Sequence, residues 1–222
     1  MQFRCLATDY DGTLAENGRV AEATLRALAR LAASGCQTVL VTGRTQPDIE
    51  LVFPQFDRFS RVVAENGAVL STPGSGQARV LAEPPPRALV ELLRQRRVTP
   101  LEIGQVIVAT REGHARAVQQ AIATLGVPLD VILNKHAVMI LPRGVDKATG
   151  LAAARAELKL SPAETVAIGD AENDAVMLAA CGQGVAVANA LPALKASADW
   201  VTRGEAGQGV VELIDHLLAG EA

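Results

Sequence analysis

The sequence has few of the residues that form disulfides or bind transition metals. Its 222 residues include three cysteines, Cys5, Cys36 and Cys181, which lie far apart and form no CxxC pair. The three histidines are equally dispersed. This spacing excludes a disulfide framework and a Cys/His metal site, and an odd number of cysteines is typical of a reducing compartment.

An excess of positive charge and long apolar segments are also missing. The 21 Lys and Arg against 24 Asp and Glu leave a net charge of −3, which argues against a nucleic-acid partner bound by a basic face. Residues 175–194 carry no charge, but Gly182, Asn189 and Pro192 interrupt them and predict helix, turn, strand and turn instead of a membrane span. With no secretory signal predicted, we expect a cytoplasmic protein without a membrane or nucleic-acid partner.

Two parts of the chain alternate short apolar runs with helical patterns. Strands are predicted at residues 3–8, 38–41, 61–64, 165–168 and 184–187. Helices are predicted at residues 22–34, just after Pro47, and at 147–158, 172–180 and 209–218. Repeated strand–helix units of this length predict an α/β protein with a parallel sheet covered by helices on both faces.

The segment between these parts has a different pattern. It begins at a stiff run of three prolines, Pro84 to Pro86, and ends at a second helix breaker, residues 142–144. Within it we predict helices at 87–96 and 113–125 and strands at 103–110, 130–133 and 137–141. We interpret residues 83–144 as a small inserted α+β domain, and residues 1–82 and 145–222 as the core that carries it.

Two carboxylates directly follow the first predicted strand, in the sequence Asp9-Tyr10-Asp11-Gly12-Thr13. Open α/β sheets bind ligands at this end of their strands, and Gly12 permits the tight turn that such a loop needs. A solvated turn would explain the segment equally well if it stood alone.

A second acidic cluster follows a later strand, in Gly169-Asp170-Ala171-Glu172-Asn173-Asp174. Acidic residues favoured at a helix N-terminus explain Glu172, but not two acidic clusters at the ends of neighbouring strands. Two carboxylates about 4 Å apart repel by about 4 kcal/mol at an effective dielectric constant of about 20. Four of them (Asp9, Asp11, Asp170 and Asp174) therefore need a cation, and hard oxygen ligands with room for water favour Mg²⁺.

Polar and basic residues occur next to the same predicted edge of the sheet. Thr42, Gly43 and Arg44 follow the second strand, and Lys147 begins the helix after the insert. A hydroxyl and an ammonium group could hold a phosphoryl group against Asp9. Taken singly, Lys147 could be a surface lysine and residues 42–44 an ordinary turn.

Taken in order, these segments resemble the four motifs of the haloacid dehalogenase-like (HAD) phosphatase superfamily over the whole chain. The DxDGT motif matches Asp9 to Thr13, the second and third motifs match Thr42 and Lys147, and GDxxND matches Gly169 to Asp174. The insert, together with residues 42–44 and 65–68, resembles the sheet-type cap subgroup that contains Cof-like phosphatases and archaeal-type phosphoglycolate phosphatases. The departures are Tyr10, at a position that is usually aliphatic, and a short cap.

The resemblance implies a Rossmann-like core with a cap, and a catalytic role for four residues. Asp9 would be the nucleophile that forms an aspartyl-phosphate, and Asp11 would protonate the leaving oxygen and then activate water. Lys147 would offset the charge of the phosphate, and Thr42 would bind its oxygens. Gly43 and Arg44 would add substrate contacts.

The resemblance also implies a Mg²⁺ site. Asp9, Asp170 and the backbone carbonyl of Asp11 would be ligands, whereas Asp174 would ligate the metal or hold its water. Asn173 would lie beside the substrate or support Lys147.

We therefore expect a Mg²⁺-dependent phosphomonoester hydrolase that acts on a small phosphorylated metabolite, a sugar phosphate first and phosphoglycolate second. Lys135, His136 and Arg143 are the candidate substrate contacts of the cap. A phosphomutase with the same core, a receiver-type signalling domain and a non-catalytic phospho-ligand binding protein are the alternatives. The sequence leaves open whether the protein is a monomer or a homodimer.

Overall fold

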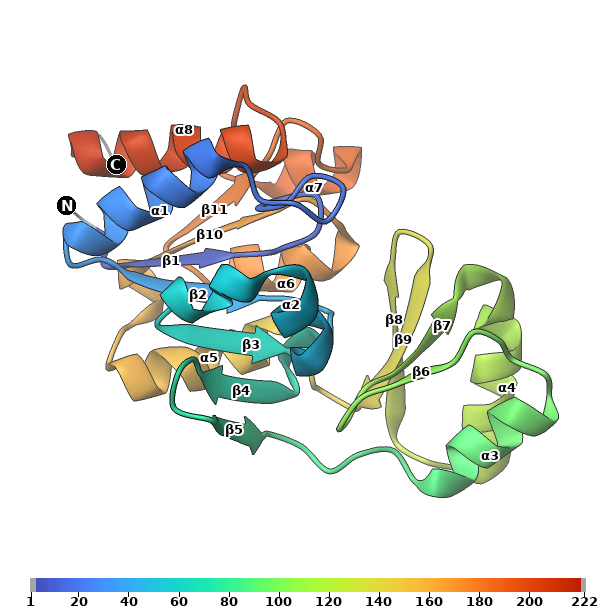
Figure 1. The fold of residues 1–222 in the computed structure, drawn as a ribbon. Coiled ribbons are helices and arrows are strands. Elements are labelled where there is room, and N and C mark those ends of the chain that lie inside the picture. Colours follow the sequence, from blue (N-terminus) through green and yellow to red (C-terminus); the bar gives the residue numbers. More distant parts are fainter. Residues whose placement is uncertain (1–2, 221–222) are drawn as a thin grey trace.

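A large, mostly parallel sheet forms the centre of the computed structural model, which describes residues 3–220. Its strands are β1 (Cys5–Thr8), β2 (Gln37–Val41), β3 (Arg61–Ala64), β4 (Val69–Thr72), β5 (Gln77–Val80), β10 (Thr165–Gly169), β11 (Gln183–Ala186) and β12 (Trp200–Val201). They lie in the order β12-β11-β10-β1-β2-β3-β4-β5 (Figure 1). The strands from β12 to β3 pair in parallel, and β4 and β5 extend the sheet as an antiparallel hairpin.

Helices cover both faces of this sheet, as the sequence predicts. They are α1 (Glu22–Ala33), α2 (Gln46–Val52), α5 (Lys147–Leu158), α6 (Ala175–Ala179), α7 (Pro192–Ser197) and α8 (Ala206–Ala219). The short 3₁₀ helices are η1 (Pro54–Arg58), η2 (Glu65–Gly67), η3 (Glu112–His114), η4 (Pro162–Glu164) and η5 (Glu172–Asp174). Helices α1 and α8 pack together on one face, and α5 and α6 lie on the other (Figure 1). Apolar side chains such as Leu28, Leu31 and Val39 are buried between the layers, where removal from water stabilises the fold.

A second, smaller sheet lies beside the carboxyl ends of the parallel strands (Figure 1). This cap contains α3 (Arg87–Gln95), β6 (Glu102–Ile103), β7 (Val108–Arg111), α4 (Ala115–Leu125), β8 (Leu129–Asn134) and β9 (Ala137–Pro142). Its antiparallel sheet has the order β6-β7-β9-β8, and α3 and α4 pack on one face around Leu89, Leu93 and Val118. The other face of the cap sheet is turned towards the core.

The predicted fold class is confirmed, with differences in individual elements. The sequence did not predict the β4–β5 hairpin, α7 or β12, and one strand predicted at 103–110 is instead two strands, β6 and β7, joined by a turn. Residues 175–194 form α6, β11 and the start of α7, as expected, and no helix within residues 3–220 is long and apolar enough to cross a membrane. The cap sheet falls inside the predicted insert, whose boundaries at 83 and 144 stay a prediction.

A buried glutamate of the core holds the turn that divides the predicted cap strand. Glu65 and Asn66 have left-handed backbones (φ 52° and 55°), which directs the Glu65 side chain at the cap. Its carboxylate accepts hydrogen bonds from the backbone N–H groups of Gln105 (2.8 Å), Val106 (2.7 Å) and Ile107 (2.8 Å). A Cβ atom on Gly104 would lie 2.5 Å from that carboxyl group, so only glycine permits this approach.

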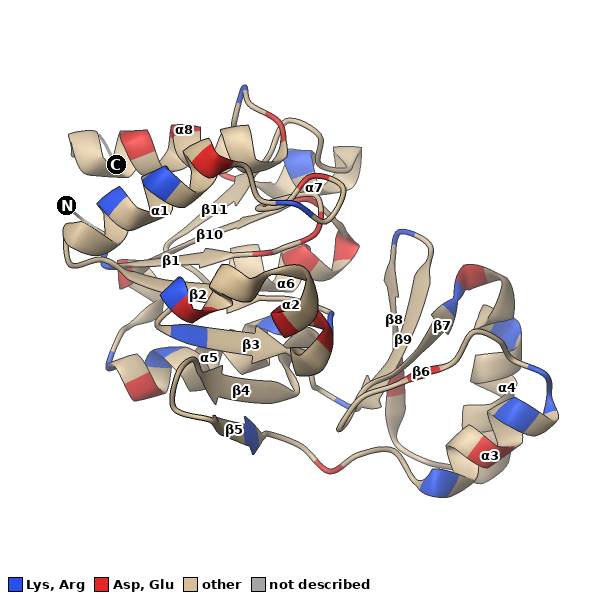
Figure 2. Cartoon of the chain, in the orientation of Figure 1, with Lys and Arg blue, Asp and Glu red and all other residues tan. Residues whose placement is uncertain are grey.

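The tip of the β8–β9 hairpin makes a second contact with the core. The Lys135 backbone N–H donates to Glu172 at 3.1 Å, and the Lys135 ammonium donates to Asp170 at 2.7 Å. Figure 2 shows this basic tip beside an acidic segment of the core. An apolar cluster that includes Ala68 of the core and Ile107 and Met139 of the cap lies between the two polar contacts. The cap therefore contacts the core through both of these polar contacts and through the apolar cluster.

We expect Glu65→Ala to lower the free energy of unfolding by at least about 2 kcal/mol, because three N–H groups, two of them buried, lose their acceptor. Urea unfolding measures this, with Glu83→Ala on the exposed connector as the matched control. Glu65→Gln should cost less, since one oxygen is kept. A Glu65→Ala protein as stable as the control would show that this contact does not hold the cap.

Candidate active site

A buried lysine joins two carboxylates that lie far apart in the sequence. Asp9 follows β1, Asp174 ends η5, and Lys147 is the first residue of α5. The Lys147 Nζ atom lies 2.6 Å from Asp9 Oδ1 and 2.6 Å from Asp174 Oδ1. The Lys147 side chain is 1% exposed and that of Asp174 is 0% exposed. These three predicted residues therefore meet at the carboxyl edge of the sheet, and Lys147 is not a surface lysine.

Burial and mutual charge perturb the pKa values of this cluster. Burial raises the pKa of Asp9 to about 7, with the Asp174 and Asp170 charges adding to the rise and Lys147 opposing it. Burial by itself would lower the pKa of Lys147, but Asp174 and Asp9 together raise it above its ordinary value. The Lys147 ammonium is therefore charged at neutral pH. The negative charge that Asp9, Asp170 and Asp174 can carry together exceeds the single positive charge of Lys147.

Asp170 lies next to this group in a loop shaped by Asp174. The second carboxylate oxygen of Asp174 accepts the backbone N–H groups of Asp170 and Ala171, both at 2.9 Å. The Asp170 carboxylate in turn accepts a hydrogen bond from the Lys135 ammonium. Burial raises the pKa of Asp170, and the charge of Lys135 opposes that rise. Gly12 is required here because its φ is 86° and a Cβ atom would collide with the Asp170 carboxylate.

Three carboxylates could hold a metal ion. One oxygen each from Asp9, Asp170 and Asp174 lies within 4.8 Å of the others, and all three residues are buried. Buried hard oxygen donors with surplus negative charge suit a divalent cation such as Mg²⁺. The residues therefore fit the predicted metal. The fourth predicted carboxylate, that of Asp11, is not part of this group.

The Asp11 side chain instead binds Arg44. The Arg44 guanidinium donates to both Asp11 oxygens, at 2.6 and 2.8 Å, and to Asp48 at 2.6 Å. Its carbon lies 5.6 Å from the centre of the Tyr10 ring, which is fully buried. Tyr10 thus supports the arginine that orients Asp11, which accounts for an aromatic residue at a usually aliphatic position. Arg44 itself is occupied by two carboxylates.

The other predicted substrate contacts, which include Thr42, Asn173 and Arg143, lie in different parts of the structure. Thr42 is buried, and its hydroxyl accepts the Arg44 backbone N–H at 3.1 Å, which leaves its proton to donate. Asn173 donates to Asn66 at 2.9 Å, and, within residues 3–220, Asn173 Oδ1 and Asn66 Nδ2 are buried without a partner. The sequence indicates no separate role for Asn66, although residues 65–68 are part of the resemblance. Arg143 lies beside Asp130, at the end of the β8–β9 hairpin opposite to its tip.

A cleft of about 610 Å³ separates the core from the cap above Asp9 and Asp11. Its core side also contains Gly43, Arg44, Thr45 and Asp48. Its cap side contains Glu102, Ile103, Ile107, Ala109, Asn134, Ala137 and Met139. The volume lies in the range of small-molecule sites, and a bound molecule would touch both the acidic edge and the cap sheet.

Comparison with known proteins identifies the family. The model of the haloacid dehalogenase-like hydrolases matches residues 6–98 and 94–214. The phosphoglycolate phosphatase of Methanoculleus marisnigri is 29% identical over 223 residues, which cover 96% of this chain and 95% of that protein. The phosphoglycolate phosphatase of Haloarcula marismortui is 31% identical over 219 residues, which cover 94% and 95%.

A solved structure agrees with this relationship at the level of the fold. A haloacid dehalogenase-like hydrolase from Bacteroides thetaiotaomicron superposes with a TM-score of 0.82 and 20% identity, covering 97% of this chain and 99% of that one. The chain belongs to the haloacid dehalogenase-like hydrolase family, as a phosphatase, and the predicted resemblance is confirmed.

We expect Mg²⁺ to raise the melting temperature of the protein, because an ion that binds only the folded state at about 100 times its Kd adds about 2.7 kcal/mol. Asp170→Asn should lose most of this rise, since it removes one of three clustered carboxylates. Asp57→Asn, at an exposed carboxylate, is the matched control and should keep it. A thermal shift measured with and without chelator checks this, and an equal shift in both variants would contradict the site.

Proposed function

We propose that the protein is a Mg²⁺-dependent phosphomonoester hydrolase that acts on a small phosphorylated metabolite through an aspartyl-phosphate on Asp9. The observation that carries this proposal is the Asp9 carboxylate, which lines the cleft and is held by Lys147 at 2.6 Å. The phosphoglycolate phosphatases that resemble the chain along its length support the same reaction.

Asp9 has one oxygen bound to Lys147 and a second that is available for attack on phosphorus. A carboxylate is a weak nucleophile towards an anionic phosphate, so positive charge must offset their repulsion. Lys147 supplies part of that charge, and the Thr42 hydroxyl holds a phosphoryl oxygen. Asp9, Asp170 and Asp174, with the Asp11 backbone carbonyl as a further ligand, would hold Mg²⁺, which would supply the rest of that charge.

Asp11 acts as the acid and then the base in this proposal. As the bond from phosphorus to the leaving oxygen breaks and the bond to Asp9 forms, Asp11 gives its proton to the leaving oxygen. In the second step water attacks the phosphorus, its proton passes to Asp11, and Asp9 leaves as a carboxylate with release of inorganic phosphate. Asp11 must exchange a hydrogen bond to Arg44 for the leaving oxygen, so Arg44 orients the acid.

The remaining predicted contacts serve binding. Gly43 lines the cleft, where its backbone lets a substrate approach closely, and Asn173 is held by Asn66 behind Asp170. A cleft of about 610 Å³ between the core and the cap suits a small metabolite. Phosphoglycolate is the substrate in the names of the relatives, and a sugar phosphate is the second candidate.

A phosphomutase with this core would return the phosphoryl group to a bound sugar phosphate, whereas a phosphatase releases inorganic phosphate without an added acceptor. A non-catalytic binding protein would release none. Asp9, Asp11 and Lys147 are all present and together at the cleft or directly behind it, which favours catalysis.

We expect Asp9→Asn to reduce phosphate release by at least about a thousandfold, because the amide cannot act as the nucleophile. The change is nearly isosteric, so the circular dichroism spectrum should match that of the wild type. Turnover near the wild-type rate in a folded Asp9→Asn protein would remove Asp9 from the mechanism.

We expect Asp11→Asn to slow the steady-state rate by about 100-fold or more, because the proton carrier is lost. With p-nitrophenyl phosphate, whose leaving group needs no proton, a burst of nitrophenol should precede slow turnover while phosphoenzyme accumulates. Rapid-mixing absorbance measures the burst. Full activity on alkyl phosphates would show that Asp11 has no acid–base role.

A further inference from the structure

The basic side chains around the cleft differ in whether their charge is already neutralised. Arg44 is bound by Asp11 and Asp48, and Lys147 is bound by Asp9 and Asp174. Lys135, which reaches in from the cap, is bound by Asp170. None of these three cations is available to a second anionic group of a substrate unless it first leaves a carboxylate.

Arg111 is different. It ends β7, and its guanidinium makes no hydrogen bond or ion pair among residues 3–220. Its register partner is Ala137, and the neighbouring core-facing pair is Ala109 with Met139. Because side chains alternate along a strand, Arg111 and Ala109 share the face that lines the cleft. Thr110 lies on the opposite face, where its hydroxyl donates to the Pro100 carbonyl at 2.6 Å.

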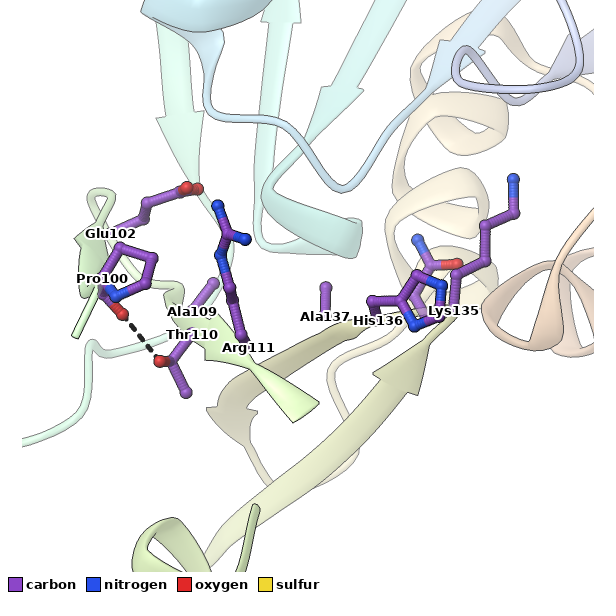
Figure 3. A pocket seen from close by; sticks show the side chains of 9 residues that line it. Pro100, Glu102, Ala109, Thr110, Arg111, Lys135, His136 and Ala137 are labelled. Carbon is purple, nitrogen blue, oxygen red and sulfur yellow. Dashed lines mark hydrogen bonds between the residues drawn. The ribbon is translucent and has the colours of Figure 1, made fainter. Parts of the chain in front are cut away.

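A second hollow of about 380 Å³ lies beside Arg111 and adjoins the active-site cleft. It is lined by Arg111, Lys135 and His136, and it shares Glu102, Ala109, Asn134 and Ala137 with the cleft over Asp9. Figure 3 shows Arg111 and Lys135 extending on the same side of the cap sheet, with Ala137 between them. The two hollows therefore adjoin each other on the cap sheet, one over Asp9 and one beside Arg111.

The cap residues that line the two hollows leave room for a ligand. Ala109 and Ala137 are small, so no bulky side chain fills the space beside Arg111. Asn134 lines both hollows, and its amide oxygen is buried without a partner in the described part of the chain. That oxygen is ready to accept one hydrogen bond from a bound molecule. Glu102, across from Ala109 on β6, also lines both hollows, and Figure 3 shows its carboxylate on the Arg111 side of the cap sheet.

We propose that Arg111 is a specificity-determining residue, which binds a second anionic group, a carboxylate or a second phosphate, of a metabolite whose phosphoryl group lies against Asp9. This inference rests on the proposed function and adds the class of substrate. A guanidinium without a carboxylate partner can bind either group through two parallel hydrogen bonds. Neutral sugar monophosphates would leave Arg111 without a ligand.

The test compares substrates that differ only in the second anion. Phosphoglycolate is paired with ethyl phosphate, and 3-phosphoglycerate with glycerol 3-phosphate, for the carboxylate. Fructose 1,6-bisphosphate paired with fructose 1-phosphate tests the second phosphate. Arg111→Gln should lower kcat/KM on the preferred acidic member by about 10- to 100-fold, mainly through KM, with less than about a twofold change on its neutral partner. Arg111→Lys should fall between.

Arg116→Gln is the matched control, because Arg116 is an exposed cap arginine on α4, which packs on the opposite face of the cap sheet. It should change neither member of a pair. Equal losses on both members, or no loss on any acidic substrate, would overturn the role of Arg111. The pair that shows the effect identifies the second anion.

A binding measurement separates this inference from the proposed function. Titration calorimetry of phosphoglycolate into Asp9→Asn and into Asp9→Asn/Arg111→Gln does not depend on turnover. We expect about tenfold weaker binding to the double variant and equal binding of ethyl phosphate. If phosphate is never released but this difference holds, the proposed function fails and the role of Arg111 stands. Equal affinities of the two variants for phosphoglycolate, 3-phosphoglycerate and fructose 1,6-bisphosphate would overturn it even in an active enzyme.

Discussion

The ion pairs of Lys147 with Asp9 and Asp174 are the interaction on which the rest of the site depends. They join the loops after β1 and β10 to the start of α5, in a place where each charge is buried. Asp146 fixes the start of that helix by accepting the Thr149 backbone N–H at 2.8 Å, which aims Lys147 at the sheet edge. Breaking such a pair leaves an uncompensated buried charge and costs about 3–5 kcal/mol. A substitution that removes one of these charges therefore also destabilises the packing of this edge.

The same edge holds the cap. Glu65 binds the β6–β7 turn through three backbone N–H groups, and Asp170 binds Lys135 of the β8–β9 tip. Asp170 is also one of the three carboxylates that fit a metal, so one side chain takes part in both cap contact and charge balance. A substrate reaches Asp9 through a cleft whose far wall is the cap sheet. In the proposed function, the core sheet would carry the catalytic residues and the cap sheet would select the substrate across this cleft.

Local patterns were enough to predict the parallel core. Helix α1 and strand β1 are strongly apolar on their buried sides, and each signals its type without help from the rest of the chain. Strand β5 has four exposed residues, and β12 has only two residues, so neither carries a periodic signal. The break between β6 and β7 depends on Glu65, which lies about forty residues earlier. Such elements are defined by pairing and by distant contacts, which sequence periodicity does not contain.

The order of two acidic loops, a threonine and a lysine was sufficient to recognise the family, because each residue follows or begins an element that ends at one sheet edge. The prediction that Asp9, Asp170 and Asp174 lie together depended on that topology alone. The sequence did not predict which carboxylate pairs with each basic side chain. Arg44 faces Asp11, Lys135 faces Asp170, and Arg111 lines a hollow without an ion-pair partner among residues 3–220. Pairing between side chains depends on ångström distances between segments remote in the chain, and only the folded arrangement of core and cap sets those distances.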